Sequence, residues 1–161
     1  MRNLYEQCLR ETDSNRKGKL FEEFVAEFFR GISGFDVDKR LKICFTDLDV
    51  VVKVDKPEHI VKYGNFIVVQ CRNIKDPLGP QAILELQSQA KVYGSLVKIA
   101  VLATTSKLTN NTKSRLRSVN ESGEIFIVVI EGEDWEFFLG SDLTSKEFFD
   151  IMIKETPKKY R

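Results

Sequence analysis

Three segments combine a mostly apolar run with a polar side chain that a buried element does not need. FIVVQCRN starts with four apolar residues, and Gln70, Cys71 and Arg72 follow before any turn residue appears. In TDLDVVVKV, Asp49 stands within an apolar run, where an unpaired carboxylate is costly. Glu22 lies at the edge of the apolar stripe of GKLFEEFVAEFF. Carboxylate and amide oxygens suit Mg²⁺ and a guanidinium binds phosphate, so these residue types fit metal-assisted phosphodiester hydrolysis.

Each residue also has a simpler interpretation. Asp49 fits an edge-strand acid paired with a lysine, because charged residues are common on edge strands. Gln70 and Arg72 are also consistent with the end of a strand that emerges into solvent. Glu22 is also consistent with an ordinary acid on a surface helix. Singly these alternatives remain open, whereas the combination, in this order and on these elements, favours a site.

Hydrophobic periodicity indicates which elements position these residues. Apolar residues at helical spacing predict a helix within 18–31, and a capping box of Thr144 and Glu147 predicts a C-terminal helix over about 144–156. Further helices are predicted within 81–94 and 108–120, strands within 35–43, 46–54, 66–72, 97–105 and 124–132, and a loop over 55–65. The order indicates an α/β domain, with a mixed central β-sheet flanked by helices on both faces. On the strand 46–54, alternation places Asp49 opposite Leu48 and Val50.

Composition is that of one ordinary globular domain over residues 1–161, with 42% hydrophobic and 30% charged residues. The sequence has neither a membrane-spanning run of ~20 apolar residues nor a secretory signal, so a cytoplasmic (intracellular) protein is expected. Cys8, Cys44 and Cys71 lack metal-ligand spacing and are predicted to be reduced thiols. His59 is predicted to lie in a loop without a role.

The net charge of +1 gives no argument for nucleic acid, but the basic residues are clustered. One cluster is Arg16, Lys17 and Lys19, and the other is Lys107, Lys113, Arg115 and Arg117, within a stretch that has no acid. Such runs are usually solvated faces. They become candidates for binding DNA phosphates only if an active site lies beside them.

The segments FEEFVAEFF, DLDVVV, VVQCRN and VLATTSKLT together resemble the Mrr-type branch of the PD-(D/E)XK nucleases. The resemblance covers about residues 18–130 and implies a restriction-endonuclease-like three-layer core and a site for Mg²⁺ or Mn²⁺. It implies that Asp49 ligates the metal beside the Gln70 side chain and the backbone carbonyl of Cys71, and that Glu22 acts through a water molecule. The family's strand end of Thr-Thr-Ser type matches residues 104–106.

Gln89 and Tyr93 match the Q-x-x-x-Y pattern of the related RecB-like nucleases, where it helps to position the site. The same spacing arises readily in any amphipathic helix. These two residues are therefore predicted as supporting residues.

One position departs from the family, because Arg72 stands where its members carry a lysine. Arginine stays protonated, so it keeps phosphate affinity but cannot serve as a general base. Lys53 or Lys91 could supply an ammonium instead.

The first hypothesis is a metal-dependent DNA endonuclease with Glu22, Asp49, Gln70 and Arg72 as catalytic residues. The alternatives are a catalytically inactive relative that binds nucleic acid or a protein partner, and a purely structural module. Specificity is expected from a homodimer, a separate specificity subunit or DNA structure, because the chain has no room for a recognition domain.

Overall fold

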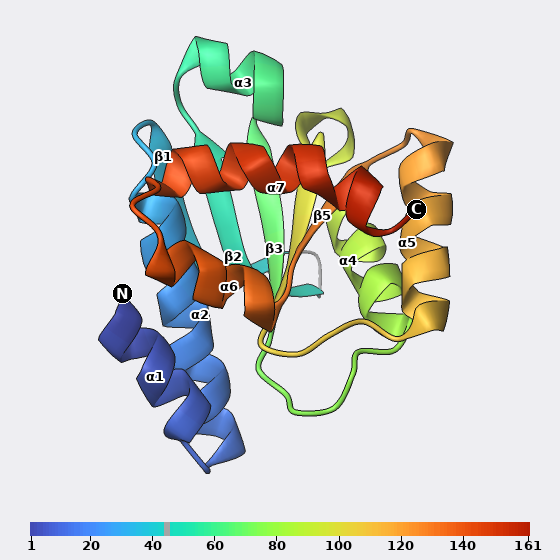
Figure 1. Cartoon of the computed structure of the whole chain (residues 1–161). Helices are drawn as coiled ribbons and strands as arrows, with labels where there is room; N and C mark the ends of the chain where they lie inside the picture. Colours follow the sequence, from blue (N-terminus) through green and yellow to red (C-terminus); the bar gives the residue numbers. More distant parts are fainter. Residues whose placement is uncertain (44–45) are drawn as a thin grey trace.

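The computed structural model describes residues 1–43 and 46–161, together with their side chains except over 40–47. Cys44 therefore lies outside the described residues. A five-stranded sheet runs through the centre of the protein in the spatial order β1-β2-β3-β4-β5 (Figure 1). The strands are β1 (Phe35–Ile43), β2 (Thr46–Val54), β3 (Phe66–Arg72), β4 (Ile99–Thr104) and β5 (Phe126–Ile130).

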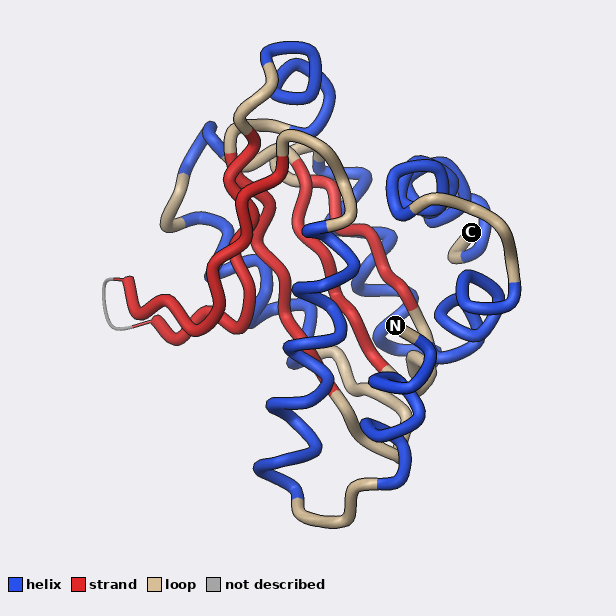
Figure 2. Tube along the Cα trace, turned by 90° about the vertical axis from the view of Figure 1, so that its left-hand side faces the viewer, coloured by secondary structure: helices blue, strands red, loops and turns tan. Residues whose placement is uncertain are grey.

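The sheet is mixed, as the sequence predicted. β1 pairs with β2 and β2 with β3 in antiparallel fashion, whereas β3, β4 and β5 are parallel to one another. β1 and β2 stay paired along their whole length, but β2 pairs with β3 only over Val50 to Lys53. Figure 2 shows the resulting β1–β2 hairpin projecting from the body of the protein.

Two hydrophobic cores lie on opposite faces of the sheet and make a three-layer architecture. The first core lies against α1 (Arg2–Arg10), α2 (Ser14–Arg30), α6 (Gly132–Gly140) and α7 (Ser145–Lys159), and is rich in phenylalanine around the fully buried Trp135. The second lies against α4 (Gln81–Lys91) and α5 (Asn110–Ser122). Both faces of the parallel strands are thus covered, which explains the wholly buried β4.

The restriction-endonuclease-like α/β fold class that the sequence predicted is confirmed. Gly31 caps α2 at its C-terminus, and Thr144 and Glu147 form the predicted capping box of α7. α2 begins four residues before the predicted segment because the side chain of Asp13 caps it.

Three helices were not predicted. α1 and α6 are short, and the sequence analysis treated α3 (Pro57–Tyr63) as loop. The loop prediction for His59 was therefore wrong: this residue lies on α3, is 9% exposed and packs edge-to-face on Phe35. A single turn of 3-10 helix, η1 (Gly94–Leu96), precedes β4. No helix within the described residues is both long and apolar enough to cross a membrane.

Candidate active site at the end of β3

β2 separates from β3 at Asp49. The ladder between the strands ends at the pair Val50 and Val69, and beyond it the backbone N–H of Cys71 donates to Asp49 Oδ2 at 2.8 Å. A side-chain carboxylate thus accepts the hydrogen bond of a backbone amide just past the end of the ladder. The direction of the β2 side chains also changes at this point. Leu48 packs in the second core with Val51, whereas strand alternation predicted that Leu48 would share a face with Val50. Asp49 and the Gln70–Arg72 segment therefore meet, as the site hypothesis requires.

Gln70 and Arg72 point to the same face of the sheet and share one partner on α4. Glu85 Oε2 accepts from Gln70 Nε2 at 3.0 Å and from Arg72 Nη2 at 2.6 Å. The other terminal nitrogen of the guanidinium, Nη1, lies 3.9 Å from Asp49 Oδ2. Arg72 therefore bridges the carboxylates of Asp49 on β2 and Glu85 on α4.

The amide of Gln70 has a defined orientation. An ionised carboxylate only accepts hydrogen bonds, so the nitrogen of the amide must face Glu85 and the oxygen must face elsewhere. Gln70 is 1% exposed, and its Oε1 has no hydrogen-bond partner among the described residues. A buried acceptor of this kind is stabilised by a water molecule or a cation.

Glu22 on α2 approaches the same end of β3 from the first-core face. Burial raises the pKa of the Cys71 thiol well above its ordinary value, and the negative charges of Asp49 and Glu22 raise it further. Both carboxylates thus act electrostatically on one side chain. The Cys71 side chain packs in the first core.

The donor set fits a hard divalent cation such as Mg²⁺. Asp49 and Gln70 Oε1 would supply oxygen ligands, and Glu22 approaches the end of β3 from the other face of the sheet. Within the described part of the chain, no three His, Cys, Asp or Glu side chains are grouped closely enough to hold a metal ion. Mg²⁺ does not need such a group, because it commonly binds one or two carboxylates, waters and substrate phosphates. The carboxylates of Asp49 and Glu85 against the guanidinium of Arg72 leave a formal charge of −1, and Glu22 adds a further negative charge from the other face of the sheet, which a divalent cation would offset.

Comparison with known proteins identifies the family of this chain. The sequence model of the Mrr-type restriction endonuclease family matches residues 14–136, which include all four predicted catalytic residues. The chain belongs to the Mrr-type restriction endonuclease family.

No curated protein matches this member of the family. Among solved structures, the crystal structure of protein VC1899 from Vibrio cholerae is similar, with 14% sequence identity and a TM-score of 0.47. The alignment covers 94% of this chain and 36% of the VC1899 chain, so this chain spans little more than a third of that protein.

In this restriction endonuclease family member, three residues with predicted supporting roles lie away from Arg72: Tyr93, Lys53 and Lys91. Tyr93 packs against Phe66, and Phe66 begins the strand that Arg72 ends, ~20 Å away at ~3.3 Å per residue. Lys53 pairs with Asp55 and Lys91 with Glu124, so neither ammonium is placed beside the site. Gln89, by contrast, lines the same hollow of about 240 Å³ along α4 as Glu85.

Asn73, the residue after β3, connects the site to the start of α2 and to the residue that follows β4. Its Nδ2 donates to the backbone carbonyls of Cys8 at 3.0 Å and Lys17 at 3.1 Å, and its Oδ1 accepts from Thr105 Oγ1 at 2.9 Å. The start of α2, which carries Arg16, Lys17 and Lys19, is thereby held at the end of β3. The residues matched to the family's Thr-Thr-Ser end mainly fix loops, since Ser106 Oγ also donates to the carbonyls of residues 75 and 76.

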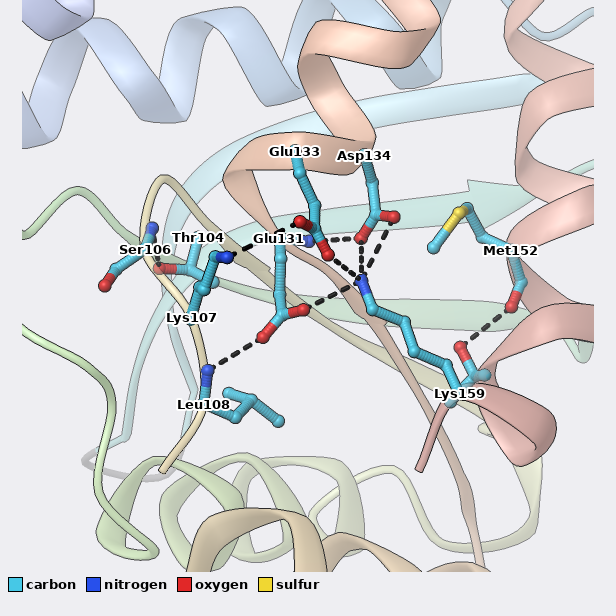
Figure 3. A network of polar contacts seen from close by, with 10 residues as sticks. Thr104, Ser106, Lys107, Leu108, Glu131, Glu133, Asp134, Met152 and Lys159 are labelled. Atoms are coloured by element: carbon cyan, nitrogen blue, oxygen red, sulfur yellow. Dashed lines mark hydrogen bonds and ion pairs between the residues drawn. The ribbon is translucent and has the colours of Figure 1, made fainter. Parts of the chain in front are cut away.

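The second basic cluster is divided by the fold. Lys107 follows β4 in a loop anchored by the buried Glu131, which accepts from the backbone N–H of Leu108 at 2.7 Å and pairs with Lys159 at 2.8 Å (Figure 3). Lys107 itself lies 3.6 Å from Glu133, with its side chain 72% exposed.

The rest of that cluster lies on α5. Lys113 is half-buried and Arg115 is exposed. Arg117 Nε donates to the backbone carbonyl of Tyr160 at 3.1 Å, which ties this side chain to the C-terminal end of the chain. Arg117 therefore has a structural partner, as Lys107 has in Glu133.

Glu85 and Asn73 are the two residues of the site that the sequence analysis missed. Glu85 is the only acid in the helix predicted within 81–94, and this isolation was the available signal. Asn73 directly follows the motif residues, but its three partners lie 32 to 65 residues away in the chain. No local pattern reports such contacts.

Proposed function

We propose that this protein is a metal-dependent deoxyribonuclease that uses the end of β3 as its active site. The observation that carries the proposal is the convergence of Asp49, from β2, with Gln70 and Arg72 of β3 around one point where the strands separate. Membership of a restriction endonuclease family supports DNA as the substrate.

Each side chain has a role that its chemistry permits. Asp49 and Gln70 Oε1, with the carbonyl of Cys71, would hold Mg²⁺ or Mn²⁺, and Glu22 would take part through a water molecule. The bound ion supplies charge neutralisation at the phosphate and lowers the pKa of water. Arg72 binds the scissile phosphate, exchanging its contact with Asp49 for phosphate oxygens. The Cys71 N–H keeps the Asp49 carboxylate in place.

DNA on either side of the cut is held by the basic clusters. Arg16, Lys17 and Lys19 lie on the α2 start that Asn73 fixes beside the site, and Lys107 lies on the loop after β4. Lys113, Arg115 and Arg117 on α5 are the remaining candidates for flanking phosphates, and the bond of Arg117 to the carbonyl of Tyr160 makes it the weakest of them. A homodimer, a specificity subunit or DNA structure would supply target choice.

A plasmid-nicking assay tests the proposal. The wild type should relax supercoiled plasmid with Mg²⁺ or Mn²⁺ and stop when EDTA is added. Asp49→Asn keeps the volume but removes the ligand charge, so it should abolish nicking. Asp55→Asn is the matched control, because Asp55 pairs with Lys53 just past the opposite end of β2 and its loss should leave nicking unchanged. Equal activity of the wild type and Asp49→Asn would refute the assignment.

A second function is favoured by one observation, the engagement of Arg72 by Glu85 at 2.6 Å. An arginine fixed in this way suits a relative that binds DNA, or a protein partner, without cutting it. Binding of duplex DNA at low salt without product in any divalent metal would select this function over the nuclease.

A further inference from the structure

Through a single carboxylate oxygen, Glu85 on α4 contacts two polar side chains of β3. Its Oε2 accepts from Gln70 Nε2 at 3.0 Å and from Arg72 Nη2 at 2.6 Å. The Glu85 side chain is 40% exposed, whereas Gln70 is 1% exposed. The Glu85 carboxylate therefore lies where the open hollow along α4 meets the buried end of β3.

The contact dictates which atom of Gln70 is available to a ligand. Free rotation of a glutamine amide would present nitrogen or oxygen to the cleft with similar ease, and only oxygen binds a cation. The acceptor-only carboxylate of Glu85 removes this choice, leaving Oε1 as the buried atom without a hydrogen-bond partner in the described part of the chain.

The same contact accounts for a neutral residue at position 70. A glutamate there would place a second carboxylate about 3 Å from Glu85, where like charges repel. Glutamine instead donates to Glu85. The negative charge of this pair therefore lies on α4 and not on β3. Arg72 is held by the same oxygen, with its other nitrogen turned toward Asp49.

We propose that Glu85 is a positioning residue of the nuclease site, which orients the Gln70 amide oxygen toward a divalent cation and holds Arg72 beside Asp49. This inference rests on the proposed function for its cation. The pairing of Glu85 with Gln70 is testable without one.

The first test is Mn²⁺ affinity, measured by calorimetry on the full chain without DNA. Glu85→Gln retains the size of the side chain, but its own amide can donate to Gln70 and allow the inverted orientation. We expect the Mn²⁺ dissociation constant to rise about tenfold, as for other residues that orient metal ligands. Glu121→Gln, an exposed acid on α5, is the matched control and should bind Mn²⁺ like the wild type. An unchanged affinity of Glu85→Gln would overturn the positioning role.

The second test is a double-mutant cycle in metal-free protein at mildly alkaline pH. Gln70→Glu should lower Tm by ~3 °C or more, because two carboxylates then face each other. Adding Glu85→Gln should restore most of that loss by re-forming an amide–carboxylate pair with its ends exchanged. Additive changes in Tm would overturn the proposal. If the wild type nicks no plasmid in any divalent metal, the proposed function fails, and the cycle still decides the role of Glu85.

Discussion

The Asn73→Ala variant tests whether the half-buried side-chain amide of Asn73 holds the start of α2, with its candidate DNA-binding residues, beside the active site. The variant removes two donated hydrogen bonds, to the carbonyls of Cys8 and Lys17, and one accepted from Thr105. Each such bond contributes about 1 kcal/mol net, and the partly buried position lets water replace some of them. We expect a loss of about 2 kcal/mol in the free energy of unfolding, or ~6 °C in Tm for a chain of this size.

The chain offers a matched control for this loss. Asn120 donates to the carbonyl of Ile127 at 3.0 Å and accepts from its N–H at 2.8 Å, so it fixes α5 to β5 in a comparable way. Asn120→Ala should cost a similar amount of stability. It does not touch the segment that carries Lys17 or the strand end that carries Arg72.

DNA binding separates the two variants. Fluorescence anisotropy with a labelled duplex in Ca²⁺, at a temperature where both variants are folded, gives the dissociation constant at several salt concentrations. Asn73→Ala should bind more weakly, and the slope of log affinity against log salt should be smaller by about 1 for each phosphate that the variant no longer binds. Asn120→Ala leaves the α2 start in place and should therefore bind DNA more tightly than Asn73→Ala, although α5 carries Lys113, Arg115 and Arg117. Equal affinity for the two variants would refute the coupling of the α2 start to the site.

Two further predictions concern single residues. Arg72→Lys should nick plasmid faster than the wild type, because a lysine ammonium reaches only one carboxylate and can then bind the phosphate. A nicking rate of Arg72→Lys no higher than that of Arg72→Met would contradict a phosphate-binding role for residue 72. Gly132→Ala should lower Tm by several degrees, since an added Cβ would lie 2.4 Å from the carbonyl oxygen of Thr105. Gly140→Ala is the control in the same helix, because an added Cβ there meets nothing within 4 Å. This substitution should raise the free energy of unfolding by ~0.5 kcal/mol or more. Comparable thermal melts for the two variants would refute the steric argument.

Local patterns were enough for the elements that carry the site. β1, β2 and β3 begin and end at the predicted residues, because alternation and apolar runs are properties of adjacent positions. The capping residues of α7 and the glycine that ends α2 were equally local signals. The short helices α1, α3 and α6 escaped prediction because their stability comes from packing onto the first core rather than from their own sequence.

The sequence by itself determined which residue types were available for chemistry: a carboxylate at Asp49, an amide at Gln70 and a guanidinium at Arg72, each at the end of a strand or inside it. Tertiary structure alone decided how they are used. The separation of β2 from β3 brings Asp49 to the Cys71 N–H, and the packing of α4 on the sheet brings Glu85 to Gln70 and Arg72. These contacts join residues 13 to 22 positions apart across different elements, and their distances follow from strand register and helix packing, which no short stretch of sequence encodes.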